Sequence, residues 1–149
     1  MSTHTGTSRA QDLREIDKLH SLDVAATLSG DQAALSTGWT DDFVLLEQGE
    51  EPAVGKQAIL AARDRRSAAM PGFRVVTYVP EIKDVTIADG WAFEWGLFTG
   101  SFVQPSGEEM AFRGKLLECS RSRPTGAARS RSGCGTRDTL KCDHPSVGP

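Results

Sequence analysis

The sequence has no apolar run that approaches the roughly 20 residues needed to cross a bilayer. The stretch from Met1 to Ala10 is polar and has no apolar core of the kind found in a secretory signal. A hydrophobic content of 38% and a charged content of 25% are typical of a soluble globular protein. We therefore expect 149 residues to form one domain in the cytoplasm, without a membrane partner.

The common motifs of cofactor and metal binding are also missing. The sequence contains no phosphate-binding loop, no dinucleotide glycine fingerprint and no histidine-rich metal spacing, so we expect no cofactor and no metal. A zinc set would need Cys119, Cys134, Cys142 and His144, whose spacing is loose. The Arg/Ser-rich run 120–132 has no interleaved aromatic residues for base stacking, and no specific nucleic-acid partner is predicted.

The composition changes near Leu117. Residues 1–117 have a net charge of −6 and residues 118–149 a net charge of +3, and the second segment has no Ile, Phe, Trp, Tyr or Met. Such a segment cannot bury enough apolar surface to offset the entropy lost on ordering. We predict a disordered N-terminus over 1–8, a folded domain over 9–117, and a tail over 118–149 that is mostly disordered.

Within the folded part, hydrophobic periodicity predicts three helices and then an antiparallel meander. The helices are expected to end at Gly30, near Thr37 and at Pro71-Gly72. A short strand over Asp42–Glu47 lies between the second and third helices. The later strands are predicted at Phe73–Val79, Ile82–Ala88, Trp91–Val103 and Glu109–Leu117, with a hairpin turn at Asp89-Gly90 and bulges or bends at Gly96 and Gly100. Helices on one face of an antiparallel sheet make an α+β fold.

Glu47 is the leading catalytic candidate. In the strand that it ends, Phe43, Leu45 and Glu47 share one face, because side chains alternate along a strand. A carboxylate at the end of an apolar row is a possible general base, since desolvation raises the pKa of such a group. A solvent-facing carboxylate beside Glu50 and Glu51 is the structural alternative.

Three short stretches carry a resemblance to a known family: Gly30-Asp31-Gln32-Ala33-Ala34-Leu35, Trp39-Thr40-Asp41-Asp42-Phe43 and Gly55-Lys56-Gln57-Ala58-Ile59. Preceded by a helix and followed by a meander, they resemble the nuclear transport factor 2-like superfamily over residues 9–117. That superfamily includes ketosteroid isomerase and the SnoaL-type polyketide cyclases. The resemblance implies a cone-shaped curved antiparallel sheet packed on three N-terminal helices, with a cavity at the open end and dimerisation through the outer sheet face.

The resemblance also bears on individual residues. Counting from Asp41-Asp42, Glu47 falls where ketosteroid isomerase has its proton-shuttling aspartate, and Asp23 falls where that enzyme has its oxyanion-hole tyrosine. The only tyrosine, Tyr78, is far from that position in the sequence. Ketosteroid isomerase pairs its carboxylate base with a tyrosine and a protonated aspartic acid, so steroid isomerisation is not expected of this chain.

The other candidate ligand-binding residues are His20, Asp23, Phe43, Trp95, Arg113 and Lys115. His20 lies on the apolar stripe of the first helix. Its role is that of an acid/base group, of a hydrogen-bond partner for an inward carboxylate, or of a core histidine without a function, which is the commoner case. Asp23 is more typical of a helix surface. Trp95 shares one strand face with Trp91, Phe93 and Leu97, which lines either a cavity or a dimer interface. Arg113 and Lys115 either bind an anionic substrate, pair with Glu47 or Glu94, or lie on an exposed edge strand.

The tail departs from the resemblance after Lys115, where the family continues with two further strands and a terminal tryptophan. A shifted reading frame from Leu117 onward can encode two apolar strand-like runs around Ala-Asp-Gly-Ser and a tryptophan. We state this as a hypothesis that the codons actually used in the gene will decide. A sheet without its last strand would expose an edge and lower stability.

Two functions follow as expectations. One is a small-molecule cavity protein that acts as an acid/base isomerase, cyclase or dehydratase on a hydrophobic carbonyl compound, with Glu47 as base. The alternative is a non-catalytic dimerisation or ligand-binding module. The expected partners are an unidentified hydrophobic small molecule and a second copy of the chain if the sheet is complete.

Overall fold

The computed structural model describes residues 9–47, 50–122, 129–131 and 135–137. Three helices are present in these ranges, α1 (Arg9–Ser29), α2 (Gln32–Ser36) and α3 (Lys56–Ala69). The strands are β1 (Val44–Glu47), β2 (Ala53–Val54), β3 (Arg74–Ala88), β4 (Trp91–Val103), β5 (Glu109–Ser122), β6 (Arg129–Arg131) and β7 (Gly135–Arg137). No helix among the described residues is long and apolar enough to cross a membrane.

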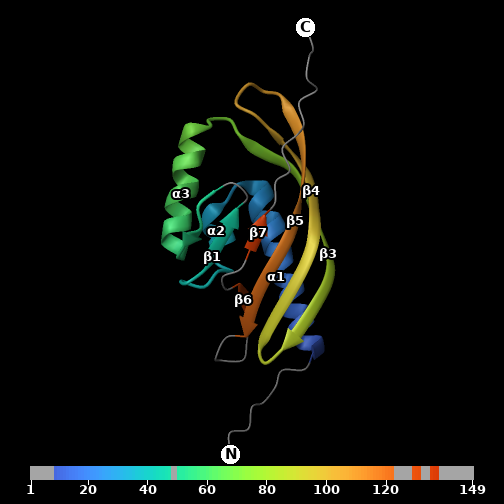
Figure 1. Ribbon diagram of the computed structural model, residues 1–149. Coiled ribbons are helices and arrows are strands. Elements are labelled where there is room, and N and C mark those ends of the chain that lie inside the picture. Colours follow the sequence, from blue (N-terminus) through green and yellow to red (C-terminus); the bar gives the residue numbers. More distant parts are fainter. Residues whose placement is uncertain (1–8, 48–49, 123–128, 132–134, 138–149) are drawn as a thin grey trace, which may run out of the picture.

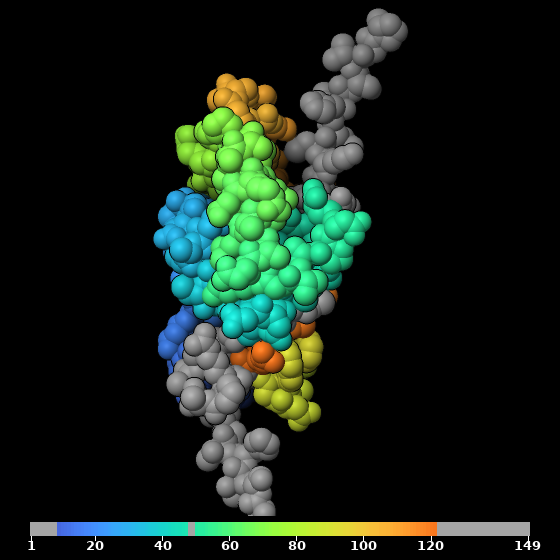
Figure 2. Space-filling model, turned by 90° about the vertical axis from the view of Figure 1, so that its left-hand side faces the viewer, coloured from blue at the N-terminus to red at the C-terminus, as the bar shows by residue number. Residues whose placement is uncertain are grey.

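The strands form two sheets. The larger has the order β3-β4-β5-β6 and is antiparallel throughout, and the smaller has the order β2-β1-β7. Figure 1 shows the three long strands β3, β4 and β5 as a curved sheet, with α1 running along one face of it. Helix α3 lies on the opposite side of the molecule from β3, β4 and β5. Figure 2 views the molecule from this helical side, and α3 runs down the middle of the view. The predicted α+β fold, with three helices and a curved antiparallel sheet, is confirmed, and of the helices α1 is the one that packs on the long strands.

Helix α2 begins where the sequence predicts, at a capped turn. The Asp31 side chain accepts a hydrogen bond of 2.9 Å from the backbone N–H of Ala34, which satisfies one of the unpaired donors at the helix start. Helix α2 then packs Leu35 into an apolar cluster that also contains Trp39, Phe43 and Ile59. This cluster joins the three helices to β1.

Replacing Asp31 by alanine is expected to lower the free energy of unfolding by about 1 kcal/mol, because the helix loses its side-chain cap. Urea denaturation measures the change. Asp64→Ala on the exposed face of α3 is the matched control, and it should stay within about 0.5 kcal/mol of the parent. Equal losses in the two variants would contradict the capping role.

The strand prediction needs one correction before the hairpin. The sequence predicts separate strands at Phe73–Val79 and Ile82–Ala88, but the chain forms one strand, Arg74–Ala88, that continues through Pro80. Pro80 is accommodated because β3 is at the edge of its sheet, where a missing N–H donor removes no central ladder bond. The predicted turn at Asp89-Gly90 is present, with positive φ of 49° and 80° at its two residues.

The end of β5 needs the second correction. The sequence predicts that this strand stops at Leu117, yet it pairs with β4 up to Arg121 opposite Trp91 and extends to Ser122. Alternation explains the extension, because Leu116, Glu118 and Ser120 are all buried on the inward face. Residues 118–122 are therefore part of β5. The predictions of disorder for 1–8 and for most of 123–149 concern residues that lie largely outside the described ranges.

Arg121, near the end of β5, contacts β4 and the segment before β1. Its guanidinium lies 5.9 Å from the centre of the Trp91 ring and 3.4 Å from the Asp42 carboxylate. A side-chain hydrogen bond from Thr40 and, to a lesser extent, the charge of Arg121 hold the pKa of Asp42 below its ordinary value. Beyond that point, β6 adds three register pairs to β5.

Candidate active site

The long sheet has an inward face that is apolar at one end and acidic at the other. Tyr78, Phe98 and Leu116 form a buried cluster from three adjacent strands. Further along the same face of β4 and β5, Glu94 and Glu118 lie directly opposite each other in the register. Glu94 is 2% exposed and Glu118 is 7% exposed. The strand alternation therefore brings two carboxylates into the interior side by side.

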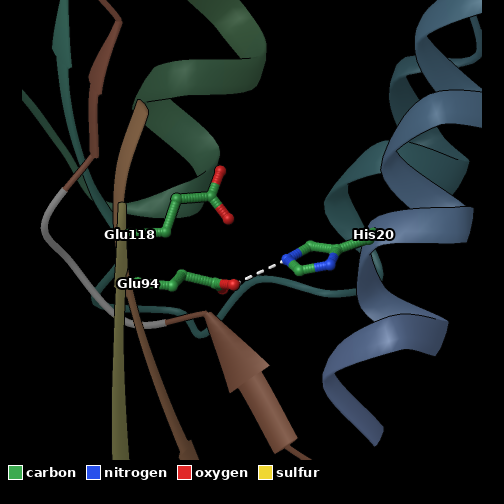
Figure 3. A group of neighbouring side chains, drawn as sticks. All are labelled: His20, Glu94 and Glu118. Carbon is green, nitrogen blue, oxygen red and sulfur yellow. Dashed lines mark hydrogen bonds and ion pairs between the residues drawn. The ribbon is translucent and has the colours of Figure 1, made fainter. Parts of the chain in front are cut away.

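His20 reaches these carboxylates from α1. Its Nε2 atom lies 2.7 Å from Oε2 of Glu94, and the histidine side chain is 18% exposed. Figure 3 shows the imidazole projecting from the helix toward the two glutamates, which project from neighbouring strands. One ligand-type atom from each of His20, Glu94 and Glu118 lies within 4.8 Å of the others. We call these three residues the His20 cluster.

The hydrogen bond between His20 and Glu94 has a defined direction when the carboxylate is ionised. An ionised carboxylate only accepts, so the Nε2–H of His20 donates to it. The bond orients the imidazole and holds one of its ring nitrogens against the carboxylate. Such a pair can take up a proton and release it again, which is the working part of general acid/base catalysis.

A second buried polar pair joins α1 to β3, and its helix member, Asp23, is less than one turn from His20. The Tyr78 hydroxyl donates a 3.2 Å hydrogen bond to Oδ2 of Asp23, and both residues are buried. The expectation that Asp23 lies on the helix surface was wrong: α1 turns this residue toward β3. The structure also places the only tyrosine beside Asp23, although the two are 55 positions apart in the sequence.

Glu47 bonds to a residue outside the His20 cluster. It ends β1 on the same strand face as the buried Leu45, as the alternation predicts. Its carboxylate bonds to Arg66 of α3 at 3.1 Å, and that arginine is half exposed. The role of Glu47 as a base stays a prediction.

The structure separates the remaining candidates. Phe43 is buried in the helix-side apolar cluster, where its ring stacks on Trp39 with 4.9 Å between the ring centres. Trp95, Arg113 and Lys115 are exposed on the outer face of the sheet, which points away from α1. Their ligand-binding role also stays a prediction, but they do not lie with His20. Asp23 and His20 are the two candidates that lie together, on the side of α1 that faces the long sheet.

Sequence reasoning missed Glu94 and Glu118 as site residues. From the sequence, Glu94 is a residue on the opposite strand face from Trp95 and a possible partner of Arg113 or Lys115, and Glu118 belongs to the predicted tail. The available signal was the alternation in β4 and β5, which places a glutamate among small and apolar inward residues. Recognising it required the register between the two strands, and only the structure supplies that.

Among known proteins, the chain is similar to several solved structures. No protein-family model matches the chain, and no curated protein matches it. A conserved protein from Planctomyces limnophilus is similar with a TM-score of 0.75 and 20% identity, over 89% of this chain and 98% of that one.

Two further solved structures are similar to the chain. A ketosteroid isomerase-like protein from Erwinia carotovora atroseptica is similar with a TM-score of 0.74 and 21% identity, over 88% of this chain and 98% of that one. An NTF2-like protein with a cystatin-like fold from Novosphingobium aromaticivorans has a TM-score of 0.67 and 22% identity, over 89% of this chain and 84% of that one. The chain therefore has the nuclear transport factor 2-like fold that the sequence resemblance predicts.

Proposed function

We propose that this protein is an acid/base enzyme that moves a proton on a small hydrophobic carbonyl compound, with His20 as the proton-transferring group. The observation that carries the proposal is the 2.7 Å contact between the His20 imidazole and the buried Glu94 carboxylate. The similarity in fold to a ketosteroid isomerase-like protein supports the class of reaction by analogy.

The exposed fractions assign the two roles. His20 keeps 18% of its side chain accessible, whereas Glu94 is 2% exposed and lies behind it. The imidazole is therefore the group that meets a substrate, and Glu94 positions the ring and stabilises its positive charge. His20 would remove a proton from the carbon next to a carbonyl, and the resulting imidazolium would return it to another carbon or to a leaving hydroxyl. The first outcome is an isomerisation and the second a dehydration.

The apolar end of the same sheet face supports a hydrophobic substrate. Phe98, Leu116 and Tyr78 lie along the inward face beyond Glu94, so a compound bound next to His20 would meet aromatic and aliphatic side chains. The Asp23–Tyr78 pair would be the polar group nearest to that end. Substrate recognition would then rest on shape and burial, with few polar contacts.

Proton exchange tests this function without knowledge of the natural substrate. A panel of hydrophobic ketones and unsaturated carbonyl compounds is incubated with the protein in deuterated buffer that contains a chelator, and NMR follows the loss of signal at carbons next to the carbonyl. Catalysed exchange on some members of the panel is expected. Exchange no faster than in buffer for every compound would contradict the proposal.

A second candidate function, dimerisation through the outer sheet face, has its own observation. Large apolar side chains are exposed there together, on three adjacent strands, and Trp95 is 51% exposed. The set consists of Val79, Trp91, Phe93, Trp95, Leu97 and Leu117. Contiguous apolar surface of this kind is typical of an interface, and two copies related by a two-fold axis would cover it.

Trp95→Glu is expected to convert a dimer into a monomer, because the interface would have to bury an unpaired charge. Size-exclusion chromatography with light scattering measures the mass. Gln57→Glu, which adds the same charge on an exposed position of α3, should leave the dimer intact. A parent protein that is monomeric at high micromolar concentration would exclude this function.

A further inference from the structure

When both carboxylates are ionised, the pairing of Glu94 with Glu118 is costly unless a positive charge lies between them. The two residues face each other directly across β4 and β5, and like charges in that arrangement destabilise a sheet. Both are more than nine-tenths buried, so water screens their repulsion poorly. With a neutral imidazole, the His20 cluster carries two negative charges. A protonated imidazole offsets one of them, whereas a divalent cation offsets both.

The donor atoms suit a divalent metal of the first transition row. One imidazole nitrogen and two carboxylate oxygens are ligands of Mn²⁺, Fe²⁺ and Zn²⁺. Metal–ligand bonds of about 2.0–2.2 Å place the ligand atoms of one site roughly 3.3–3.5 Å apart. The three atoms already lie within 4.8 Å of one another, so side-chain adjustments of about 1 Å would close the shell. The metal would take the place of the proton that His20 and Glu94 share.

Ser120 supplies an independent observation. It is completely buried, and its Oγ has no hydrogen-bond partner among the described residues. It follows Glu118 by two positions on the same inward face of β5, opposite the small Ala92 and diagonal to Glu94. A buried hydroxyl without a partner costs about 1–3 kcal/mol, which a bound ion or its water would remove. The hydroxyl is therefore an unsatisfied polar atom on the same strand face as the cluster.

We propose that His20, Glu94 and Glu118 form a binding site for a divalent transition-metal ion, with Ser120 contacting the ion or a water bound to it. Three protein ligands leave a coordination position open, as in metal sites that act on a substrate. This inference goes beyond the proposed function, which uses the same cluster without metal. Binding of the metal at Nε2 would lower the basicity of Nδ1, the ring nitrogen left to accept a proton, and would therefore slow the proton transfer proposed for His20.

The binding experiment uses Mn²⁺ alone. This ion favours oxygen and nitrogen ligands over thiolates, so binding at Cys119 or at the cysteines of the tail does not compete. The full-length protein is treated with chelator, dialysed and titrated with MnCl₂, and electron paramagnetic resonance reports the free ion. One Mn²⁺ per chain is expected. Glu118→Gln and Glu94→Gln should each weaken binding at least about tenfold, since even the loss of an outer-shell partner costs 10- to 100-fold.

Glu109→Gln is the matched control, because it removes the same charge from an exposed position of the same strand and should leave the affinity unchanged. Thermal melting of each metal-free variant shows that it folds. No Mn²⁺ binding by the parent at millimolar concentration would overturn the site. An affinity equal to that of the parent in folded Glu94→Gln and Glu118→Gln would also overturn it. Proton exchange in chelator tests the proposed function and needs no metal, while Mn²⁺ binding needs no substrate, so each can fail alone.

Discussion

Replacement of His20 by glutamine is expected to lower kcat for proton exchange about 100-fold to 10,000-fold, the range that a positioned acid/base group contributes. Glutamine has a similar size and keeps a hydrogen bond to Glu94 within reach, but it cannot take up a proton near neutral pH. The KM value should change much less than kcat, because the lost group acts mainly in the transition state. NMR exchange rates on the best compound of the panel provide both constants.

Two further variants separate the competing assignments. Glu94→Gln should also lower kcat, and it should move the pH profile of the remaining activity, since the imidazole loses its charged neighbour. Glu47→Gln should leave kcat within about threefold, because its carboxylate bonds to the half-exposed Arg66 and not to the cluster. If Glu47→Gln abolished exchange while His20→Gln retained it, the sequence-based candidate would replace His20 as the base.

Gly100→Ala is expected to cost about 3 kcal/mol or more of unfolding free energy. A Cβ atom at this position would lie 2.2 Å from the Thr77 carbonyl oxygen and 2.5 Å from the Phe112 ring. The carbonyl oxygen belongs to the backbone of β3, which cannot withdraw without opening the sheet, so the substitution overpacks the interior. Urea denaturation measures the loss.

Gly107→Ala provides the control for this prediction. Gly107 has a positive φ of 90°, but nothing lies within 4 Å of a Cβ built there, so only the backbone strain of about 1 kcal/mol is expected. A Gly100→Ala loss no larger than the Gly107→Ala loss would show that β3 and β4 do not approach as closely as the structure has them. Gly96→Ala should resemble Gly100→Ala, because its Cβ would lie 2.4 Å from the Glu81 carbonyl oxygen.

These two glycines also show how far local patterns predict the sheet. The sequence predicts irregularities at Gly96 and Gly100, and the structure has register shifts in β3 close to their partners. One shift follows Ile82, which pairs with Gly96, and the other lies between Val75 and Thr77, just before the partner of Gly100. A glycine in a strand indicates a bulge or a close approach without saying which strand bends. In this protein β4 stays in continuous register with β5, and its neighbour β3 carries the irregularity.

The candidate site was harder to predict than the fold. Among the residues singled out from the sequence, His20 and Asp23 share an interior, whereas Trp95, Arg113 and Lys115 are on the outer face and Glu47 pairs with α3. Strand alternation tells which residues share a face but not which face is covered. The helices decide that by packing on the Glu94 side and leaving the Trp95 side exposed.

By itself the sequence determined the three helices, the short strand β1 and the turn between β3 and β4, because capping at Asp31, periodicity and the Asp89-Gly90 turn are local properties that neighbouring residues set. Only the tertiary structure decided that β5 extends past Leu117 and that His20 meets Glu94 from 74 positions away. The physical reason is that burial of a carboxylate depends on which segments pack over it. That information is contained in the register of β4 with β5 and in the rotation of α1, and no stretch of neighbouring residues contains either.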